Sequence, residues 1–503
     1  MKNIRTILIL TLIALHACGD YTAPEPTASP PQEAADADLS SIIFIGGSRL
    51  AGLEDGALSQ RSVSFSVAHQ LLTSGEFVQN ASEVIPFSSS GNGFNIYENT
   101  EISGSQGKYI ASFTQTDTTS FKRFIASGDA LTYANNNASN LRSFSFPQAD
   151  VLDFTENNPS NAFVKSFFPS LNEPLADLAA GNSPSFMVFD AGMQDLVNFA
   201  LNGAEGNAEV TDAGSFQNGD LMSEALFRSK VEELTNTFLN QNPDSKGVLM
   251  NIPNILNFPM FIKLRFDVTP FIINNSRAFF STLRDDVDEY NQQLLDFYDQ
   301  NPGIPSSERR PFMDFGSDSR FNWGITVVDN DLGDVTINGQ ELPKIRHAKR
   351  DEFVLFRLEN DLRSGYGSML NDPVPATGFI SNAEASLLQN KIQAYNNILE
   401  DIAANSNGKL AIADTDALFE EMFLGFDRFL GNPAQGITVN GVLLEPLISD
   451  FGIFSTDGIN LNPIGNTLIA NVIIEAINTH FTGTVRQIDP NGVPGTDFKI
   501  GGL

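Results

Sequence analysis

Apolar and polar positions along the chain predict strands that alternate with helices between residues 41 and 480. Apolar runs predict buried strands at 41–45, 185–191, 247–251, 352–357 and 409–414. Apolar positions at helical spacing predict helices at 62–72, 172–180, 194–203, 223–239, 278–300, 382–404 and 463–478. This alternation is typical of an α/β fold with a mostly parallel sheet, in which ligands bind beyond the carboxyl ends of the strands.

Two stretches interrupt this pattern. Residues 75–137 are rich in Gly, Ser and Asn and carry short aromatic alternations, which predict a β-rich insertion. A second insertion is expected near 303–345, where Asn338-Gly339 indicates a hairpin with a type I′ turn. We treat residues 39–482 as one domain that carries both insertions, followed by a C-terminal tail at 483–503.

The N-terminus has the pattern of a bacterial lipoprotein leader. Basic residues precede an apolar run from Ile7 to Leu15 that is too short to span a bilayer. The next residues, Leu15-His16-Ala17-Cys18, resemble a lipobox. That resemblance implies that residues 1–18 hold the signal peptide and lipobox, with cleavage before Cys18 and acylation of its thiol.

The segment after Cys18 predicts a tether rather than a domain. Residues 19–38 are rich in Pro, Ala and acidic residues and lack apolar periodicity. No later stretch reaches eighteen apolar residues. We therefore expect an extracytoplasmic protein that is held at a membrane by its N-terminal lipid, with the outer membrane preferred and its periplasmic or cell-surface face left open.

Composition narrows the classes of ligand. The formal net charge is −31, which repels phosphate backbones and argues against nucleic acid as a partner. Cys18 is the single cysteine, so an intramolecular disulfide or a thiolate metal site is not expected. With four histidines in the whole chain, we predict neither a metal site nor another cofactor.

One motif carries candidate chemistry. Residues 46–58 read GGSRLAGLEDGAL and follow the first predicted strand. They resemble the first block of the SGNH/GDSL hydrolases, in a lipoprotein branch of that family. Further similarity lies at Asn251-Ile252-Pro253, at 345–358 and from 382 onward. The resemblance implies a flavodoxin-like three-layer sandwich and a serine nucleophile, Ser48, at the turn after the first strand.

The resemblance also implies the partners of that serine. A late Asp-x-x-His block supplies the base and the carboxylate that orients it, because a serine hydroxyl is a weak nucleophile until a base takes its proton. Three hydrogen-bond donors stabilise the tetrahedral oxyanion: the backbone N–H of the serine, a glycine of a second block and an asparagine of a third.

Carried over residue by residue, the match is partial. In the first block, Gly47 occupies the usual Asp or Asn place and Arg49 the usual Leu place. The second block falls at 140–153, where Gln148 replaces the oxyanion glycine. In the third block Gln194 replaces the oxyanion asparagine. The predicted oxyanion set is therefore Ser48, Gln148 and Gln194.

The last block departs most from the family. Asp457 matches the catalytic aspartate, but Asn460 stands in place of the histidine. An amide cannot accept and return a proton near neutral pH. Loss of a triad member typically costs about 10⁴-fold in rate. The divergent active site therefore favours little or no hydrolysis.

Three functions stay open on the sequence. The preferred hypothesis is a degenerate SGNH/GDSL-like protein that binds an acyl ligand, an acylated glycan or a protein partner. The alternative is an active serine esterase or acyl hydrolase that works through Ser48 and Asp457. The third is a scaffold beside an outer-membrane protein.

Overall fold

The structure is a computed structural model of the whole chain. It describes residues 36–73, 85–86, 88, 90–98, 106–114, 117–129, 131, 133, 141–264, 277–313, 324–363, 366–367 and 370–500.

The centre of the molecule is a five-stranded parallel sheet. Its strands are β1 (Ile42–Gly46), β6 (Ser143–Ser145), β7 (Phe186–Asp190), β8 (Lys246–Met250) and β15 (Leu410–Ala413). Their spatial order is β6-β1-β7-β8-β15, or 2-1-3-4-5 in chain order. The predicted α/β fold with a mostly parallel sheet is confirmed. In a sheet of this order the ligand crevice is expected at the switch point between β1 and β7.

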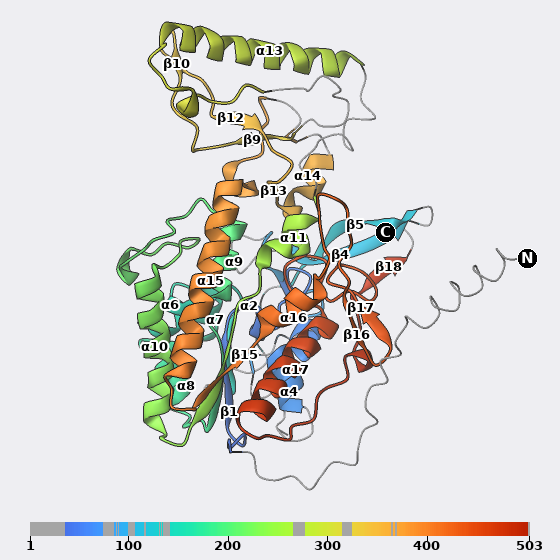
Figure 1. The fold of residues 1–503 in the computed structure, drawn as a ribbon. Coiled ribbons are helices and arrows are strands. Elements are labelled where there is room, and N and C mark those ends of the chain that lie inside the picture. The colour runs from blue at the N-terminus through green and yellow to red at the C-terminus, as the bar shows by residue number, and fades with distance from the viewer. Residues whose placement is uncertain are drawn as a thin grey trace, which may run out of the picture.

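Helices cover both faces of this sheet (Figure 1). One face carries α6 (Val151–Thr155), α8 (Leu175–Ala180), α10 (Glu224–Gln241) and α15 (Asn382–Ala404), and the other carries α4 (Val67–Thr73) and α17 (Pro463–His480). The bounds of α15 match the predicted ones, because Ser381 and Glu384 form a capping box at its start. Asn462 caps α17, where Pro463 takes the first helical position.

Two predicted elements are wrong. The single helix expected at 62–72 is two helices, α3 (Gln60–Ser64) and α4, because the Ser66 hydroxyl accepts the His69 N–H at 3.1 Å and starts a new helix. The strand expected at 352–357 shrinks to β13 (Phe353–Val354), which pairs antiparallel with β14 (Phe379–Ile380) outside the central sheet.

The first insertion is β-rich in its described part. The long strands β4 (Gln106–Thr114) and β5 (Asp117–Ser127) pair antiparallel. The short strand β3 (Phe94–Asn95) pairs with β2 (Ala57–Leu58) of the body. From the C-terminal segment, β18 (Phe498–Ile500) joins β4 in parallel. Strands of the first insertion and of the C-terminal tail therefore share one small sheet.

A separate unit stands above the sheet, at the top of Figure 1, and we call residues 277–350 the cap. In it α13 (Arg277–Gln300) packs over β9 (Thr326–Val328) and β12 (Ile345–His347) around a small core of its own, which includes Val287, Leu294 and Ile345. The predicted hairpin is β10 (Thr336–Ile337) with β11 (Gln340–Glu341). The core of the cap thus includes residues of α13, which precedes in the chain the insertion expected at 303–345.

The predicted Asn-Gly turns have the backbone that a type I′ turn needs. Asn338 and Gly339 have φ of 51° and 80°. Asn440 and Gly441 repeat this geometry, with φ of 50° and 81°, between β16 (Ile437–Val439) and β17 (Val442–Leu444).

The remaining helices are α2 (Ser48–Ala51), α7 (Ala162–Phe167), α9 (Met193–Leu201), α11 (Pro259–Ile262), α14 (Glu359–Arg363), α16 (Thr415–Met422) and the 3₁₀ turns 213–215, 255–257, 306–308, 356–358, 376–378 and 490–492.

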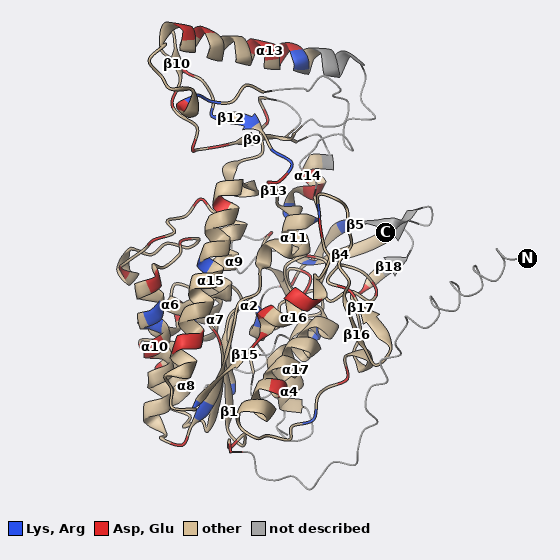
Figure 2. Cartoon of the chain, in the orientation of Figure 1, with Lys and Arg blue, Asp and Glu red and all other residues tan. Residues whose placement is uncertain are grey.

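Charge and hydropathy complete the description. Acidic positions recur along the outer helices, α13 above all (Figure 2). Among the helices that the structure describes, none combines the length and the hydropathy needed to cross a bilayer.

Candidate functional site

Ser48 lies at the carboxyl edge of the sheet, where β1 passes into the short helix α2. β1 lies between β6 and β7, so Ser48 is at the topological switch point. Ser48 is buried, and its Oγ accepts a hydrogen bond from the backbone N–H of Gln148 at 3.0 Å. Ser48 thus lies at the turn after the first strand, as the sequence predicts, and its Oγ already accepts a hydrogen bond from the protein.

Four residues close a ring of hydrogen bonds around this hydroxyl, and we call them the Ser48 ring. The Ser48 N–H donates to Gln194 Oε1 at 3.0 Å, and Gln194 Nε2 donates to Asn198 Oδ1 at 2.7 Å. Asn198 Nδ2 donates to the Gln148 carbonyl at 3.2 Å, and the Gln148 N–H returns to Ser48. The Ser48 N–H can bond only to an amide oxygen, and the Gln148 carbonyl only to an amide N–H. These two backbone groups therefore fix the orientation of the Gln194 and Asn198 side-chain amides.

The ring brings the three predicted oxyanion residues together and engages a donor of each. The Ser48 N–H, the Gln148 N–H and one N–H of the Gln194 amide donate to groups of the protein. An oxyanion hole needs these donors aimed at the point where negative charge develops. In this arrangement both backbone donors are engaged, and the Gln194 amide keeps one N–H beyond the ring.

The replacements in the first and second blocks have local causes. A Cβ at Gly47 would lie 2.7 Å from Gln194 Cβ and 2.9 Å from the Ala149 carbonyl, so a side chain at 47 does not fit in this arrangement. Gln148 has φ of 60°, the left-handed region that glycine adopts most easily. The backbone at 148 therefore keeps the geometry of the expected glycine, although a glutamine occupies it.

Arg49 is the main polar residue that motif reasoning left without a role. It is buried and forms a two-pronged ion pair with Asp190 at the end of β7, with Nη2–Oδ1 at 2.5 Å and Nε–Oδ2 at 3.0 Å. Its Nη1 donates to Thr415 Oγ1 at 3.1 Å, and its Nη2 to the Asn251 carbonyl at 3.4 Å. Arg49 thus ties the carboxyl ends of β7, β8 and β15 together beneath the site.

Asp457 and Asn460 meet as the aspartate and histidine of a triad would. Asp457 is fully buried and accepts the Asn460 side-chain amide at 3.0 Å on Oδ2. It also accepts three backbone N–H groups, from Gly56 at 2.6 Å and from Ile459 and Asn460 at 2.8 Å each. In the described structure no hydrogen bond joins Asn460 to Ser48. The carboxylate therefore orients an amide in place of a base.

The first insertion covers this corner, a role that sequence reasoning missed. Tyr97, just after β3, accepts a hydrogen bond from Asn460 Nδ2 at 2.9 Å, and burial raises the pKa of its phenol well above the usual value. Arg123 on β5 lies 3.7 Å from the centre of the Phe356 ring and pairs with Glu359 at 3.3 Å. Tyr97 therefore joins the insertion to the segment that carries Asp457, and Arg123 joins it to residues 356–359.

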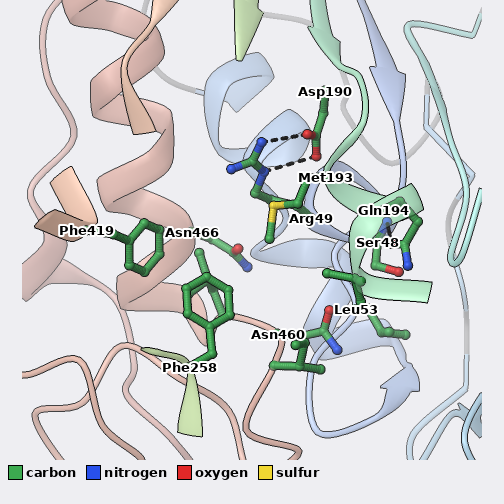
Figure 3. Close-up of a pocket in the computed structure, with 13 residues that line it drawn as sticks. Ser48, Arg49, Leu53, Asp190, Met193, Gln194, Phe258, Phe419, Asn460 and Asn466 are labelled. Atoms are coloured by element: carbon green, nitrogen blue, oxygen red, sulfur yellow. Dashed lines mark hydrogen bonds and ion pairs between the residues drawn. The ribbon is translucent and has the colours of Figure 1, made fainter. Parts of the chain in front are cut away.

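The space between Ser48 and Asn460 is small. The cavity measures about 20 Å³, room for about one water molecule. Figure 3 shows Ser48 beside Gln194 on one side and Phe258 with Phe419 on another. Of the described histidines, His69, His347 and His480, none lines it. The further lining residues are Arg49, Leu53, Asp190, Met193, Val197, Ile459, Asn460, Leu461 and Asn466.

Buried carboxyl groups surround the site. Desolvation, with the neighbouring charge of Asp55, raises the pKa of Glu54 to about 8, although Arg61 pairs with it. Burial also raises the pKa of Asp55 and of Asp195, the residue next to Gln194. Burial thus disfavours the charged form of several carboxyl groups near the site.

Cys18 and the predicted leader and most of the tether lie outside the described residues. Comparison with known proteins adds no relative, since no family model, curated protein or solved structure matches the chain.

Proposed function

We propose that this chain is an SGNH/GDSL-like protein whose catalytic centre is silent and which acts by binding. The observation that carries the proposal is the Ser48 ring, in which both predicted backbone oxyanion donors and one N–H of the Gln194 amide are bonded inside the protein. A centre that must break internal hydrogen bonds before its backbone donors can hold an oxyanion loses the preorganisation on which such catalysis depends.

The topology supports the family part of the proposal. The strand order 2-1-3-4-5 is the flavodoxin-like order that the resemblance implies. Ser48 follows the first strand at the switch point, and Asp457 and Asn460 lie just before the last long helix. This order of the blocks along the fold supports the proposed relationship to the SGNH/GDSL hydrolases.

The missing base supports the silent centre. Asn460 holds the place of the histidine, and an amide does not titrate near neutral pH. Asp457 already accepts four hydrogen bonds, and in the described structure it forms none with Ser48. It is therefore a poor substitute for the histidine as the base. The alternative, an esterase that works through Ser48 and Asp457, lacks a path for the proton.

The closed centre also restricts where a ligand binds. Sites for small molecules usually measure about 300–1,000 Å³. The cavity at Ser48, about 20 Å³, does not accommodate an acyl chain. We therefore place the binding of an acylated glycan or of a protein partner, such as an outer-membrane protein, on surfaces around the centre.

Turnover of short p-nitrophenyl esters by residues 19–503 tests this proposal. We expect equal rates, at background, for the natural chain and for Ser48→Ala. A rate well above background that disappears in Ser48→Ala would overturn the silent centre and favour the esterase.

The anchor is a separate part of the proposal. We propose that Cys18 carries the lipid that holds the protein at the outer membrane, on the lipobox resemblance of residues 15–18. Labelled palmitate fed to cells that express the full chain should be incorporated into it. Cys18→Ser should abolish the incorporation, and label that persists in this variant would contradict the anchor.

A further inference from the structure

A second hollow lies on the same edge of the sheet, between α15, α16 and the loop after β8. It measures about 490 Å³, which is within the usual size of a small-molecule site. We call it the amide groove, since six of its side chains are amides and four are carboxylates. The lining residues are Asn251, Asn254, Gln389, Ile392, Gln393, Asn396, Asn397, Glu400, Asp414, Asp416, Ala417 and Glu420.

One wall of the groove is a row of free amides. Gln389, Gln393 and Asn397 recur every four residues on α15 and therefore lie above one another on one face of the helix. In the described structure their side chains form no hydrogen bond within the protein. At 1.5 Å per residue, the stretch from Gln389 to Glu400 is about 17 Å long.

The floor of the groove is fixed in advance. Asn396 bonds both backbone groups of Ile252 at 2.8 Å, and Asn251 donates to Asp414 Oδ1 at 2.7 Å. The Asn251 carbonyl in turn accepts from Arg49. A ligand would meet a floor whose side chains are already oriented, which lowers the entropy that binding costs.

The chemistry of the walls selects the ligand. Amides offer donors and acceptors together, so a ligand with donors alone, such as a polyamine, would leave the amide donors unmatched. The lining contains four carboxylates and no Lys, Arg or His, so an anionic ligand is repelled. Among the described residues no cluster of His, Cys, Asp and Glu is arranged to hold a metal ion. Hydroxyl groups, which both donate and accept, match this lining.

We propose that the amide groove binds an uncharged polyhydroxylated ligand, a neutral oligosaccharide. The proposal rests on the binding role proposed above but not on the state of Ser48. The groove is a site apart from the cavity at Ser48, since Asn251, Gln393 and the other lining residues do not line that cavity. Negative charge is crowded in the groove, because burial and the charges of Glu420 and Asp414 raise the pKa of Asp416 to about 6. This crowding is consistent with an uncharged ligand.

Calorimetric titration of residues 19–503 tests the groove. The probes are cellotetraose, maltotetraose and chitotetraose as neutral sugars, tetragalacturonate as an anionic sugar and spermine as a cation. We expect at least one neutral probe to bind with one site per chain, and tetragalacturonate not to bind. Gln393→Ala and Asn397→Ala should each weaken that neutral probe about tenfold, since each removes an exposed hydrogen-bonding amide.

Asn390→Ala is the matched control, because Asn390 is exposed on the same helix but does not line the groove. It should leave the affinity unchanged. Binding of none of the neutral probes, binding that ignores Gln393→Ala and Asn397→Ala, or binding of spermine alone would each overturn the proposal. Ester turnover is measured separately, so failure here is distinguishable from failure of the silent centre.

Discussion

The Ser48 ring and the amide groove lie on one edge of one sheet, yet they treat their polar groups in opposite ways. In the ring, the N–H groups of Ser48 and Gln148 and the amide of Gln194 all donate to protein groups. In the groove, the amides of Gln389, Gln393 and Asn397 have no partner within the described protein. A motif shows which residues meet at a site, whereas the hydrogen bonds of each donor show whether it is free to bind a ligand.

Arg49 connects the two regions. Its guanidinium pairs with Asp190 under the ring and donates to Thr415 and to the Asn251 carbonyl at the floor of the groove. In the SGNH/GDSL hydrolases that the first block resembles, this position is usually a leucine. Arginine here gives the edge a buried ion pair that supports both regions.

Removing Arg49 should break both regions at once and give the largest effect. Arg49→Leu leaves Asp190 buried without its partner and should lower the free energy of unfolding by about 3–5 kcal/mol, measured by urea denaturation. Arg228→Leu is the control, since the Arg228–Asp401 pair is exposed and should cost about 1 kcal/mol or less. A cost for Arg49→Leu as small as that of the control would contradict the supporting role.

Raising the pH should weaken the region around the ring. The pKa of Glu54 is about 8 in the native state against its usual 4.5, so between these values the folded chain holds a proton that the unfolded chain releases. Stability is therefore complete at low pH and is lost as the pH rises towards 8. We expect the free energy of unfolding to fall by on the order of 3 kcal/mol between pH 5 and pH 8.

Glu54→Gln should flatten that profile, because the amide does not titrate. Urea denaturation at a series of pH values measures both curves. A natural chain that is equally stable at both ends of the range, or more stable at pH 8, would show that Glu54 is not held protonated.

Restoring the family residues should open the ring stepwise. Asn460→His alone returns a base but leaves the oxyanion donors bonded, so we expect less than a tenfold rise in kcat/KM for p-nitrophenyl acetate. Adding Gln194→Asn and Gln148→Gly shortens the amide on the Ser48 N–H and should bring the rise to about 100-fold. A rise of about 100-fold in kcat/KM from Asn460→His alone would show that the oxyanion donors were free.

The smallest effect concerns the backbone of the ring. Gln148 has φ of 60°, a conformation that costs an L residue about 1 kcal/mol relative to glycine. Gln148→Gly should therefore be about 1 kcal/mol more stable than Gln148→Ala in urea denaturation. Equal stability of the two variants would mean that the left-handed backbone at 148 is not needed.

Local signals in the sequence predicted the local elements well. Apolar positions at helical spacing gave α15 with the observed ends, and the Asn-Gly pair at 338–339 gave a hairpin at the observed turn. Short apolar runs gave four of the five central strands, missed β6, and suggested another strand at 352–357 that lies outside the sheet, because a run of apolar residues does not show which partner it will pair with.

The sequence predicted the residues of the candidate site but not the hydrogen bonds that they form. The motifs placed Ser48, Gln148 and Gln194 together, and the structure agrees. They could not show that Asn198 would close the ring or that Tyr97 would cover Asn460, since these contacts join residues far apart in the chain. The row Gln389-Gln393-Asn397 was readable at helical spacing, yet the groove it lines also needs α16.

The reactivity of the Ser48 hydroxyl tests the silent centre most directly. Residues 19–503 are incubated with a fluorophosphonate and the intact mass is compared with that of Ser48→Ala. We predict no adduct that depends on Ser48, because its hydroxyl has no base and its backbone oxyanion donors are bonded within the protein. A stoichiometric adduct that is lost in Ser48→Ala would contradict the account.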